Sequence, residues 1–239
     1  LELSSAASDV YKRQPWYCLP DLSEKPLLPK QLGSPSSKNT NETTLLKVFH
    51  ILLQILNFQK TTMIGIKGTG IYLPETRYSN FDRMEQFGMT EDFVRDKIGF
   101  TKLARKDPEQ TTSDLCLLAW EDLKKSYPVD LDEIDGLLVC SQNPEGHGLP
   151  HTSAMVHDKL GLPETCAAFD ISLGCSGFVY GLSVIQSFME AHGMKNGLFF
   201  TADPYSKVMD FDDKKTATLF GDGAAVTWIG TEPRFQTGQ

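Results

Sequence analysis

The chain has 239 residues, of which 40% are hydrophobic and 23% charged, so it can form a packed core and does not have the composition of a disordered protein. Its 23 basic and 31 acidic residues give a formal net charge of −8. This balance argues against sequence-independent binding to nucleic acid, because neutralising phosphates needs a surplus of lysine and arginine. An acidic protein partner would be attracted only by a local basic patch.

Cysteine spacing gives no support to a metal site. The five cysteines are Cys18, Cys116, Cys140, Cys166 and Cys175. They include no Cys-x-x-Cys pair of the kind that binds zinc, and their odd number favours a reducing compartment, which we expect to be the cytoplasm. The most apolar run, residues 45–58, contains Lys47 and His50. It is shorter than the roughly 18–20 uninterrupted apolar residues of a membrane span, so we predict none.

Composition changes sharply near Met63. Residues 1–62 have seven basic and five acidic side chains, a net charge of +2, whereas residues 63–239 have 16 and 26, a net charge of −10. The first segment also has five prolines and a polar run at residues 34–44, which favour no regular structure. Residues 9–14 resemble the translated adapter of a sequencing library. We therefore interpret residues 1–62 as a non-native or disordered leader, and residues 63–239 as the folded domain.

A targeting segment is the alternative interpretation of the leader. Residues 45–58 could form an amphipathic or signal-like helix that follows a basic residue. No cleavage site with small residues comes after it, which disfavours a secretory signal.

The first part of the domain predicts one strand and three helices. Residues 64–68 alternate as a strand does, and we expect a turn at the Gly-Thr-Gly that ends them. Ser79 and Asp82 have the spacing of a capping box, which predicts a helix over residues 81–87, closed by Gly88. Two more helices are expected. They cover residues 90–97, closed by Gly99, and residues 113–126.

The second part predicts strands that alternate with helices. The apolar runs 136–140 and 166–171 are typical of strands covered on both faces. Residues 176–192 form the longest predicted helix, with an apolar stripe at Phe178, Leu182, Ile185 and Met189. The remaining expected elements are a helix over 152–160 and strands over 197–202 and 223–229. This alternation indicates an α/β fold with a largely parallel sheet.

The segment with the clearest chemical signal is residues 169–178, Phe-Asp-Ile-Ser-Leu-Gly-Cys-Ser-Gly-Phe. Cys175 lies between a predicted strand and the first turn of an apolar helix. Free backbone N–H groups and the positive end of a helix dipole favour the reactive thiolate, so this position suits a nucleophile. Gly174 and Gly177 leave room for a thioester. The alternative is a structural cysteine, since free cysteine is among the most buried residue types.

Other candidate residues have simpler interpretations. His147, His151 and His157 lie around a loop at spacings that do not place them on one helix face, so we interpret them as solvated. Asp222, in a Gly-Asp-Gly turn, is expected to hold that turn by hydrogen bonds. The glycines of residues 65–70 lack the third glycine of a dinucleotide-binding loop.

Several separated blocks carry a family resemblance. They are residues 66–74, 97–100, 168–171 with 174–178, and 219–224. Together they resemble the N-terminal half of 3-oxoacyl-(acyl-carrier-protein) synthase III, a ketoacyl synthase of the thiolase superfamily. The resemblance covers residues 63–239. It implies an α/β thiolase-like fold, which in full form has five layers, α-β-α-β-α, with the C-terminal half missing here.

The resemblance implies an acyltransferase. An acyl-CoA primer would acylate Cys175, and malonyl-acyl carrier protein would then decarboxylate and condense with the acyl group in fatty-acid synthesis. The backbone N–H of Cys175 would form part of an oxyanion hole. The family's catalytic His and Asn belong to the C-terminal half, so we expect a truncated, inactive copy. No cofactor is implied beyond the CoA thioester substrate.

Further binding residues follow from the resemblance. Phe93 and Lys97 lie where the family commonly has a tryptophan and an arginine that bind CoA, and Lys214 lies where another arginine is usual. Lysine does not form the bidentate phosphate contact of arginine, which suggests a divergent branch. Leu149 matches a residue that reaches into the acyl tunnel of a partner subunit, which implies a homodimer. Transfer to another acceptor, or a non-catalytic acyl- or partner-binding homologue, remains the alternative.

Overall fold

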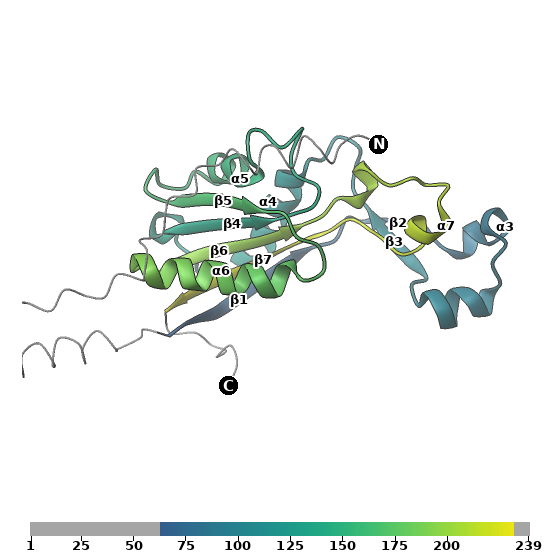
Figure 1. Ribbon diagram of the computed structural model, residues 1–239, viewed down its shortest axis with the longest axis horizontal. Coiled ribbons are helices and arrows are strands. Elements are labelled where there is room, and N and C mark those ends of the chain that lie inside the picture. Colours follow the sequence, from purple (N-terminus) through teal and green to yellow (C-terminus); the bar gives the residue numbers. More distant parts are fainter. Residues whose placement is uncertain (1–62, 232–239) are drawn as a thin grey trace, which may run out of the picture. The chain divides into compact units, whose positions relative to one another are not determined.

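The computed structural model describes residues 63–231, and the predicted leader of residues 1–62 lies outside them. The described chain contains a five-stranded sheet in the order β1-β7-β6-β4-β5 and a two-stranded sheet of β2 and β3 (Figure 1). The strands are β1 (Ile64–Tyr72), β2 (Thr76–Ser79), β3 (Lys102–Arg105), β4 (Gly136–Cys140), β5 (Ala167–Ile171), β6 (Asn196–Ala202) and β7 (Ala224–Thr231).

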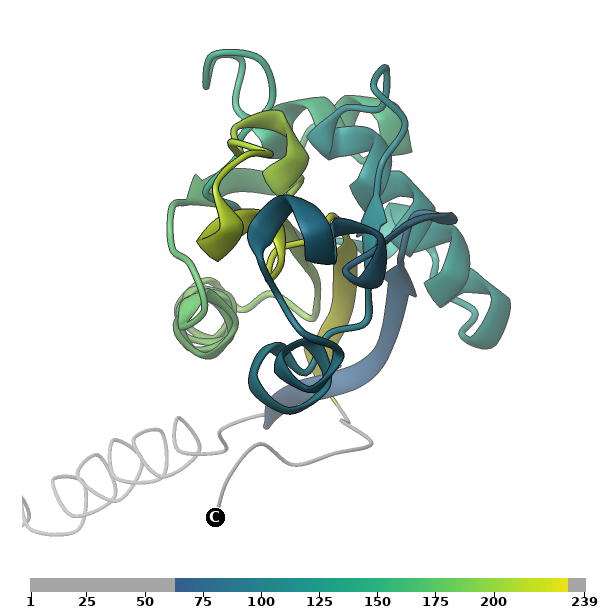
Figure 2. The same cartoon turned by 90° about the vertical axis from the view of Figure 1, so that its right-hand side faces the viewer.

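Helices cover both faces of the larger sheet. Viewed along the strands, α6 lies on one face, and α4 lies on the other (Figure 2). The α-helices are α3 (Met84–Phe87), α4 (Thr112–Ser126), α5 (Thr152–Leu160), α6 (Gly177–His192) and α7 (Lys214–Ala217). Short 3₁₀ turns cover Phe81–Arg83, Leu131–Glu133 and Tyr205–Lys207, and Phe93–Ile98 is a π-helical segment.

The α/β fold is confirmed, and the expectation of a largely parallel sheet is confirmed in part, because β7 alone runs opposite to the other four strands of the larger sheet. Strands β6, β4 and β5 are parallel neighbours, whereas β7 is antiparallel to both β6 and β1. The backbone N–H of Asp203 donates to Gly223 O over 3.2 Å, which joins the end of β6 to the start of β7. The connection from β6 to β7 therefore begins and ends at the same end of these two strands, so β7 runs in the opposite direction to β6.

The predicted turn at Gly68-Thr69-Gly70 is wrong, because β1 continues through it with a bulge between Ile66 and Gly68. The glycines serve a close approach of α4 instead. A Cβ at Gly70 would overlap backbone atoms of Leu123 in α4, and a Cβ at Gly68 would lie 2.8 Å from the ring of Tyr127.

The local helix signals are confirmed to different degrees. The bounds of α5 agree with the prediction, and Gly161 ends it in the left-handed conformation. Helix α4 begins with a capping box formed by Thr111 and Asp114. The predicted box at Ser79 is wrong, because its Oγ accepts from the N–H of Phe81, only two residues on. That segment is divided into a 3₁₀ turn and the short α3.

Helix α6 buries part of the predicted stripe, at Ile185 and Met189, and Leu182 packs against the same cluster. Its buried residues are Gly177, Gly181, Ile185 and Met189, while Phe178 is 42% exposed. A Cβ at Gly177 would overlap Cys140 Sγ in β4, and a Cβ at Gly181 would overlap the ring of Phe199 in β6. The glycines therefore allow the helix to lie directly on the sheet.

Strand β5 was expected to be buried on both faces, and this is wrong. It forms an edge of the described sheet, so its residues are only partly buried or exposed. The core lies instead on the inner strands, where side chains alternate between two clusters. Leu137 and Val139 pack with α4 and α5, and Leu138 and Cys140 pack with α6. None of the described helices combines the length and apolar character of a membrane span.

Candidate active site

The carboxyl ends of the parallel strands β4, β5 and β6 meet at one edge of the sheet, which is where ligands commonly bind in α/β folds. The loop after β5 leads into α6 and contains Cys175, which is exposed. The loop after β4 lies beside it, because the N–H of Ser141 donates to Ile171 O over 3.1 Å. The segment after β6 begins with Asp203.

A tight turn holds Cys175 at the start of α6. The N–H of Gly177 donates to Gly174 O over 2.7 Å, and Cys140 Sγ lies 3.5 Å from Leu173 O below this turn. The side chain of Ser176 makes no capping hydrogen bond. Within the described part of the chain, the backbone N–H of Cys175 has no hydrogen-bond acceptor. The positive end of the helix is therefore uncapped beside the thiol.

Two side chains beside this turn were not singled out from the sequence. Tyr205 Oη donates to Gln142 Oε1 over 2.6 Å, and that amide oxygen lies 2.9 Å from where a Cβ on Gly174 would be. The pKa of the Tyr205 phenol is raised, first by burial and then by the charges of Asp203 and Cys175. Tyr205 and Gln142 follow β6 and β4, so the sheet order brings them to Cys175.

Two carboxylates fasten the loops of this edge. Asp203 Oδ1 accepts from the N–H of Gln142 at 2.8 Å and from Asn143 Nδ2 at 3.2 Å. Burial outweighs these bonds and raises the pKa of Asp203. Asp222 accepts from the N–H groups of Lys106 and Ser206, both at 2.8 Å. The structural role expected for Asp222 is confirmed, although its bonds join two neighbouring segments rather than its own turn.

The other described cysteines are buried, as expected of packing residues. Burial raises the pKa of the Cys166 thiol to about 11, and it raises that of Cys116 further still. Burial also raises the pKa of Cys140. Cys18 lies outside the described residues. Cys175 is thus the exposed thiol of the described chain.

The residues expected to bind CoA are only partly brought together. Lys214 Nζ lies 4.6 Å from the ring centroid of Phe93 and donates to Phe87 O over 3.2 Å. Lys97 lies on the same π-helical segment as Phe93 and is exposed. Leu149 lies in the loop before α5, where 77% of it is exposed.

The histidines do not form a metal site. His157 Nε2 lies 3.0 Å from Pro163 O, and it is half-buried rather than solvated. His147 and His151 are exposed, as expected. Among residues 63–231, no three histidine, cysteine or carboxylate side chains are arranged to hold a metal ion.

Comparison with known proteins shows similarity to one family. The family model for 3-oxoacyl-[acyl-carrier-protein] synthase III matches residues 169–238, which include Cys175. The β-ketoacyl-[acyl-carrier-protein] synthase III of Caldanaerobacter subterraneus subsp. tengcongensis is 36% identical over 166 residues, which are 70% of this chain and 50% of that protein. The enzyme of the same name from Clostridioides difficile is 34% identical over 169 residues, which are 71% and 51% of the two chains.

Solved structures agree with these matches. The β-ketoacyl-[acyl-carrier-protein] synthase III of Thermus thermophilus superposes with a TM-score of 0.65 at 30% identity, over 70% of this chain and 51% of that one. The 3-oxoacyl-(acyl-carrier-protein) synthase of Burkholderia xenovorans gives a TM-score of 0.67 at 31% identity, over 72% and 49%. The chain spans about half the length of these relatives. Over about 70% of its length the chain is therefore similar to 3-oxoacyl-[acyl-carrier-protein] synthase III enzymes, and it has the α/β thiolase-like fold of these relatives.

Proposed function

We propose that the protein is a condensing acyltransferase in which Cys175 accepts the acyl group of a CoA thioester. The observation that carries the proposal is the exposed thiol of Cys175 at the uncapped start of α6, at the carboxyl edge of the parallel strands. The buried thiols of the other described cysteines offer no comparable access. Similarity to 3-oxoacyl-[acyl-carrier-protein] synthase III supports fatty-acid synthesis as the setting of this chemistry.

In the first step the Cys175 thiolate attacks the carbonyl carbon of an acyl-CoA. The carbonyl oxygen becomes an oxyanion, and the backbone N–H of Cys175, which has no acceptor among the described residues, can donate to it. The C–S bond to CoA then breaks. CoA leaves as a thiolate that takes up a proton, and the acyl group remains on Sγ.

In the second step a malonyl thioester of acyl carrier protein loses carbon dioxide. The resulting enolate carbon attacks the acyl-cysteine carbonyl, a carbon–carbon bond forms, and the Cys175 thiolate is released. By resemblance to the family, a His and an Asn of the C-terminal half polarise the malonyl carbonyl. The reaction needs no cofactor other than the CoA thioester that it consumes.

Two surface features support the proposed ligands and assembly. The ammonium of Lys214 lies over the ring of Phe93, and with Lys97 nearby the pair offers an aromatic face and two cations to the adenine and phosphates of CoA. Strand β5 forms a sheet edge, and Leu149 projects from the surface, so both are free to contact a second subunit of a homodimer.

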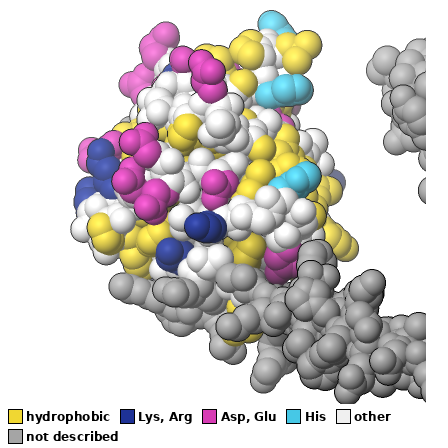
Figure 3. Space-filling model, turned by 90° about the vertical axis from the view of Figure 1, so that its left-hand side faces the viewer, with side chains coloured by type: hydrophobic (Ala, Val, Ile, Leu, Met, Phe, Trp, Pro, Cys, Tyr) yellow, Lys and Arg dark blue, Asp and Glu magenta, His cyan; other side chains and the backbone are white. Residues whose placement is uncertain are grey.

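The distribution of surface charge disfavours one end of the molecule as the docking site of the carrier protein. The end from which β4, β5 and β6 start carries more acidic than basic described side chains (Figure 3). An acidic carrier protein would be repelled there. We therefore expect it to dock at the opposite end, where Cys175 lies.

Intact-mass measurement tests the acylation step. The protein is incubated with acetyl-CoA and with longer acyl-CoAs, and we expect one acyl group to be added. Cys175→Ala should abolish the adduct, while Cys140→Ala, which removes a buried thiol of the same sheet edge, should retain it. An adduct that survives Cys175→Ala would refute the assignment. If no acyl-CoA forms an adduct although Cys175 reacts with iodoacetamide, a non-catalytic homologue is the better description.

A further inference from the structure

A second site is indicated at Arg105, the last residue of β3. Its side chain is only 4% exposed. One terminal nitrogen, Nη1, donates to Phe220 O at 2.6 Å and to Ala104 O at 3.2 Å. The other two nitrogens, Nε and Nη2, have no acceptor within the described part of the chain. A buried donor without a partner is costly, so these two N–H groups call for an explanation.

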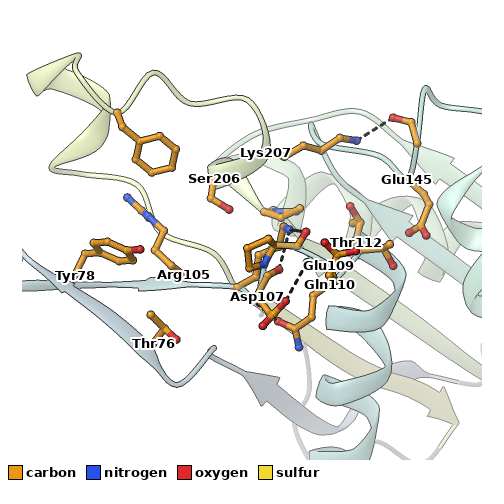
Figure 4. A pocket seen from close by; sticks show the side chains of 16 residues that line it. Thr76, Tyr78, Arg105, Asp107, Glu109, Gln110, Thr112, Glu145, Ser206 and Lys207 are labelled. Atoms are coloured by element: carbon orange, nitrogen blue, oxygen red, sulfur yellow. Dashed lines mark hydrogen bonds between the residues drawn. The ribbon is translucent and has the colours of Figure 1, made fainter.

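Two aromatic rings lie beside the guanidinium. The Arg105 Cζ lies 5.9 Å from the ring centroid of Tyr78 and 5.6 Å from that of Phe211. Figure 4 shows the guanidinium beside Tyr78. These are cation–π contacts, which favour this position of the charged group. The parallel N–H bonds of Nε and Nη2 have the geometry that binds a carboxylate in two places.

The guanidinium borders a pocket of about 630 Å³ (Figure 4). Three cations line it: Arg105, Lys106 and Lys207. Three carboxylates line it as well: Asp107, Glu109 and Glu145. The formal charges of the pocket therefore balance, which favours a ligand group with a single negative charge over a phosphate with two.

No neighbouring carboxylate is the partner of Arg105. Glu145 Oε2 accepts from the N–H of Ser113 at 2.8 Å, and Asp107 Oδ1 accepts from the N–H of Glu109 at 3.0 Å. Asp222, the acidic group with the largest influence on Arg105, accepts from two backbone N–H groups. Burial lowers the pKa of Arg105, and Asp222 offsets this only in part.

We propose that the Nε and Nη2 edge of Arg105 binds the carboxylate group of a small-molecule ligand in this pocket. The rings of Tyr78 and Phe211 cover the edge, but these side chains are 51% and 41% exposed, so a rotation of either ring gives the ligand access. Ser206, which also lines the pocket, adds a hydroxyl for the polar remainder of the ligand. The site does not depend on the thiol chemistry of Cys175.

Arginine Nε–H resonances in the 15N-labelled protein provide the test. Acetate and malonate are titrated as probes, with chloride at equal ionic strength as the control. We expect one Nε–H signal to shift downfield and saturate with either carboxylate and not with chloride. Inorganic phosphate should need at least a tenfold higher concentration for the same shift. Saturation at lower phosphate concentrations would overturn the choice of carboxylate, and no saturable shift would overturn the site.

Three variants assign the signal. Arg105→Lys should remove the responding resonance and weaken carboxylate binding at least tenfold, while Arg95→Gln, which changes an exposed arginine outside the pocket, should alter neither. Phe211→Ala keeps Arg105 and removes only an exposed ring, so it guards against misfolding of Arg105→Lys. It should weaken binding at least threefold, because water then competes for the same edge. Unchanged affinity in Phe211→Ala, or a response that persists in Arg105→Lys, would contradict the proposal.

Discussion

The two faces of the five-stranded sheet are covered in different ways. On one face, α4 and α5 enclose a cluster that contains fully buried side chains such as Leu115, Leu123 and Val156. On the other face, α6 packs on a smaller cluster and leaves its outer side apolar and exposed. The exposed residues of that side are Val179, Tyr180 and Val184, whereas the ring of Phe178 stacks on that of Phe199 in β6. One face is therefore a finished core within this chain, and α6 has the character of a helix placed between two layers, as in the five-layer thiolase-like fold.

The helices on the two faces also differ in whether a side chain caps their first turn. The capping box of Thr111 and Asp114 closes the start of α4, and the carboxylate of Asp170 accepts from the N–H groups of Thr152 and Ser153 at the start of α5. The start of α6 has no such side-chain cap. The N–H groups that a cap would satisfy are therefore available beside Cys175, where the proposed acylation would use them, whereas the caps of α4 and α5 serve stability.

Truncation of a core leucine should show the largest contrast between the faces. Leu123→Ala removes a fully buried side chain of α4 and should lower the free energy of unfolding by about 2–5 kcal/mol. Tyr180→Ala removes a larger but mostly exposed side chain of α6, and should change it by less than about 0.5 kcal/mol. Urea unfolding measures both. Equal losses would show that the outer side of α6 is covered.

Adding a methyl group under α6 should show the next largest effect. Gly181→Ala places a Cβ against the ring of Phe199 and should destabilise the protein by about 1–3 kcal/mol. At a solvent-exposed helix position, Gly→Ala would instead stabilise the protein by about 1 kcal/mol. The sign of the stability change therefore shows whether Gly181 is packed against the sheet. Because α6 would shift on the sheet, the rate at which Cys175 reacts with iodoacetamide should change as well.

The control for this change is at an exposed position of the same helix, two residues after Gly181. Ser183→Ala, at an exposed position of α6, should alter neither the stability nor the reactivity of Cys175. A stable Gly181→Ala protein would mean that α6 is not seated on β6 as described.

Elements with complete local signals could be predicted from the sequence. The bounds of β4 and α5 agree with expectation, because a continuous apolar run defines the first and Gly161 ends the second. On the buried face of α6, Ile185 and Met189 could be predicted from their spacing. Gly181 could not, because only the folded position of the Phe199 ring requires a residue without a side chain there. The direction of β7 depends on the bond between Asp203 and Gly223, which no local pattern contains.

The residues of the candidate site likewise include some that local sequence signals predict and others that only the fold brings together. Cys175 could be found because the strand, the glycine turn and the helix that position it are consecutive in sequence. Tyr205 and Gln142 are 63 residues apart and meet only because β6 and β4 are neighbours. Arg105 gave no signal, because an arginine at a strand end is ordinary until its burial and its unpaired nitrogens are known.

The two helix starts can be compared directly by removing one hydroxyl from each. Thr111→Ala breaks the capping box of α4 and should cost about 1 kcal/mol of stability. Ser176→Ala removes a side chain that caps nothing and should cost less than about 0.3 kcal/mol. Thermal unfolding of both variants measures the difference. A larger loss in Ser176→Ala would show that the start of α6 is capped after all.

The smallest expected effect is a pH dependence of the stability contributed by Asp114, which belongs to the capping box of α4. Burial acts to raise the pKa of Asp114, but hydrogen bonds from Lys159 and Thr111 outweigh it, so the pKa is lowered from its usual 3.8. A lowered carboxyl pKa contributes stability that is present above 3.8 and lost as the pH falls through the folded-state pKa. The stability difference between the protein and Asp114→Asn should therefore shrink only below about pH 4.

Asp203, at the edge that holds Cys175, should show the opposite sign. Its pKa is raised by burial, so its contribution is fully present below the usual 3.8 and is lost as the pH rises through the higher folded-state pKa. Relative to Asp203→Asn, the protein should thus become less stable as the pH rises above about 4, a range in which the Asp114 difference stays constant. Urea unfolding at several pH values separates the two. Parallel pH profiles would mean that Asp114 and Asp203 lie in equivalent surroundings. That outcome would contradict the burial of Asp203 and the ion pair of Asp114 with Lys159 at 2.7 Å.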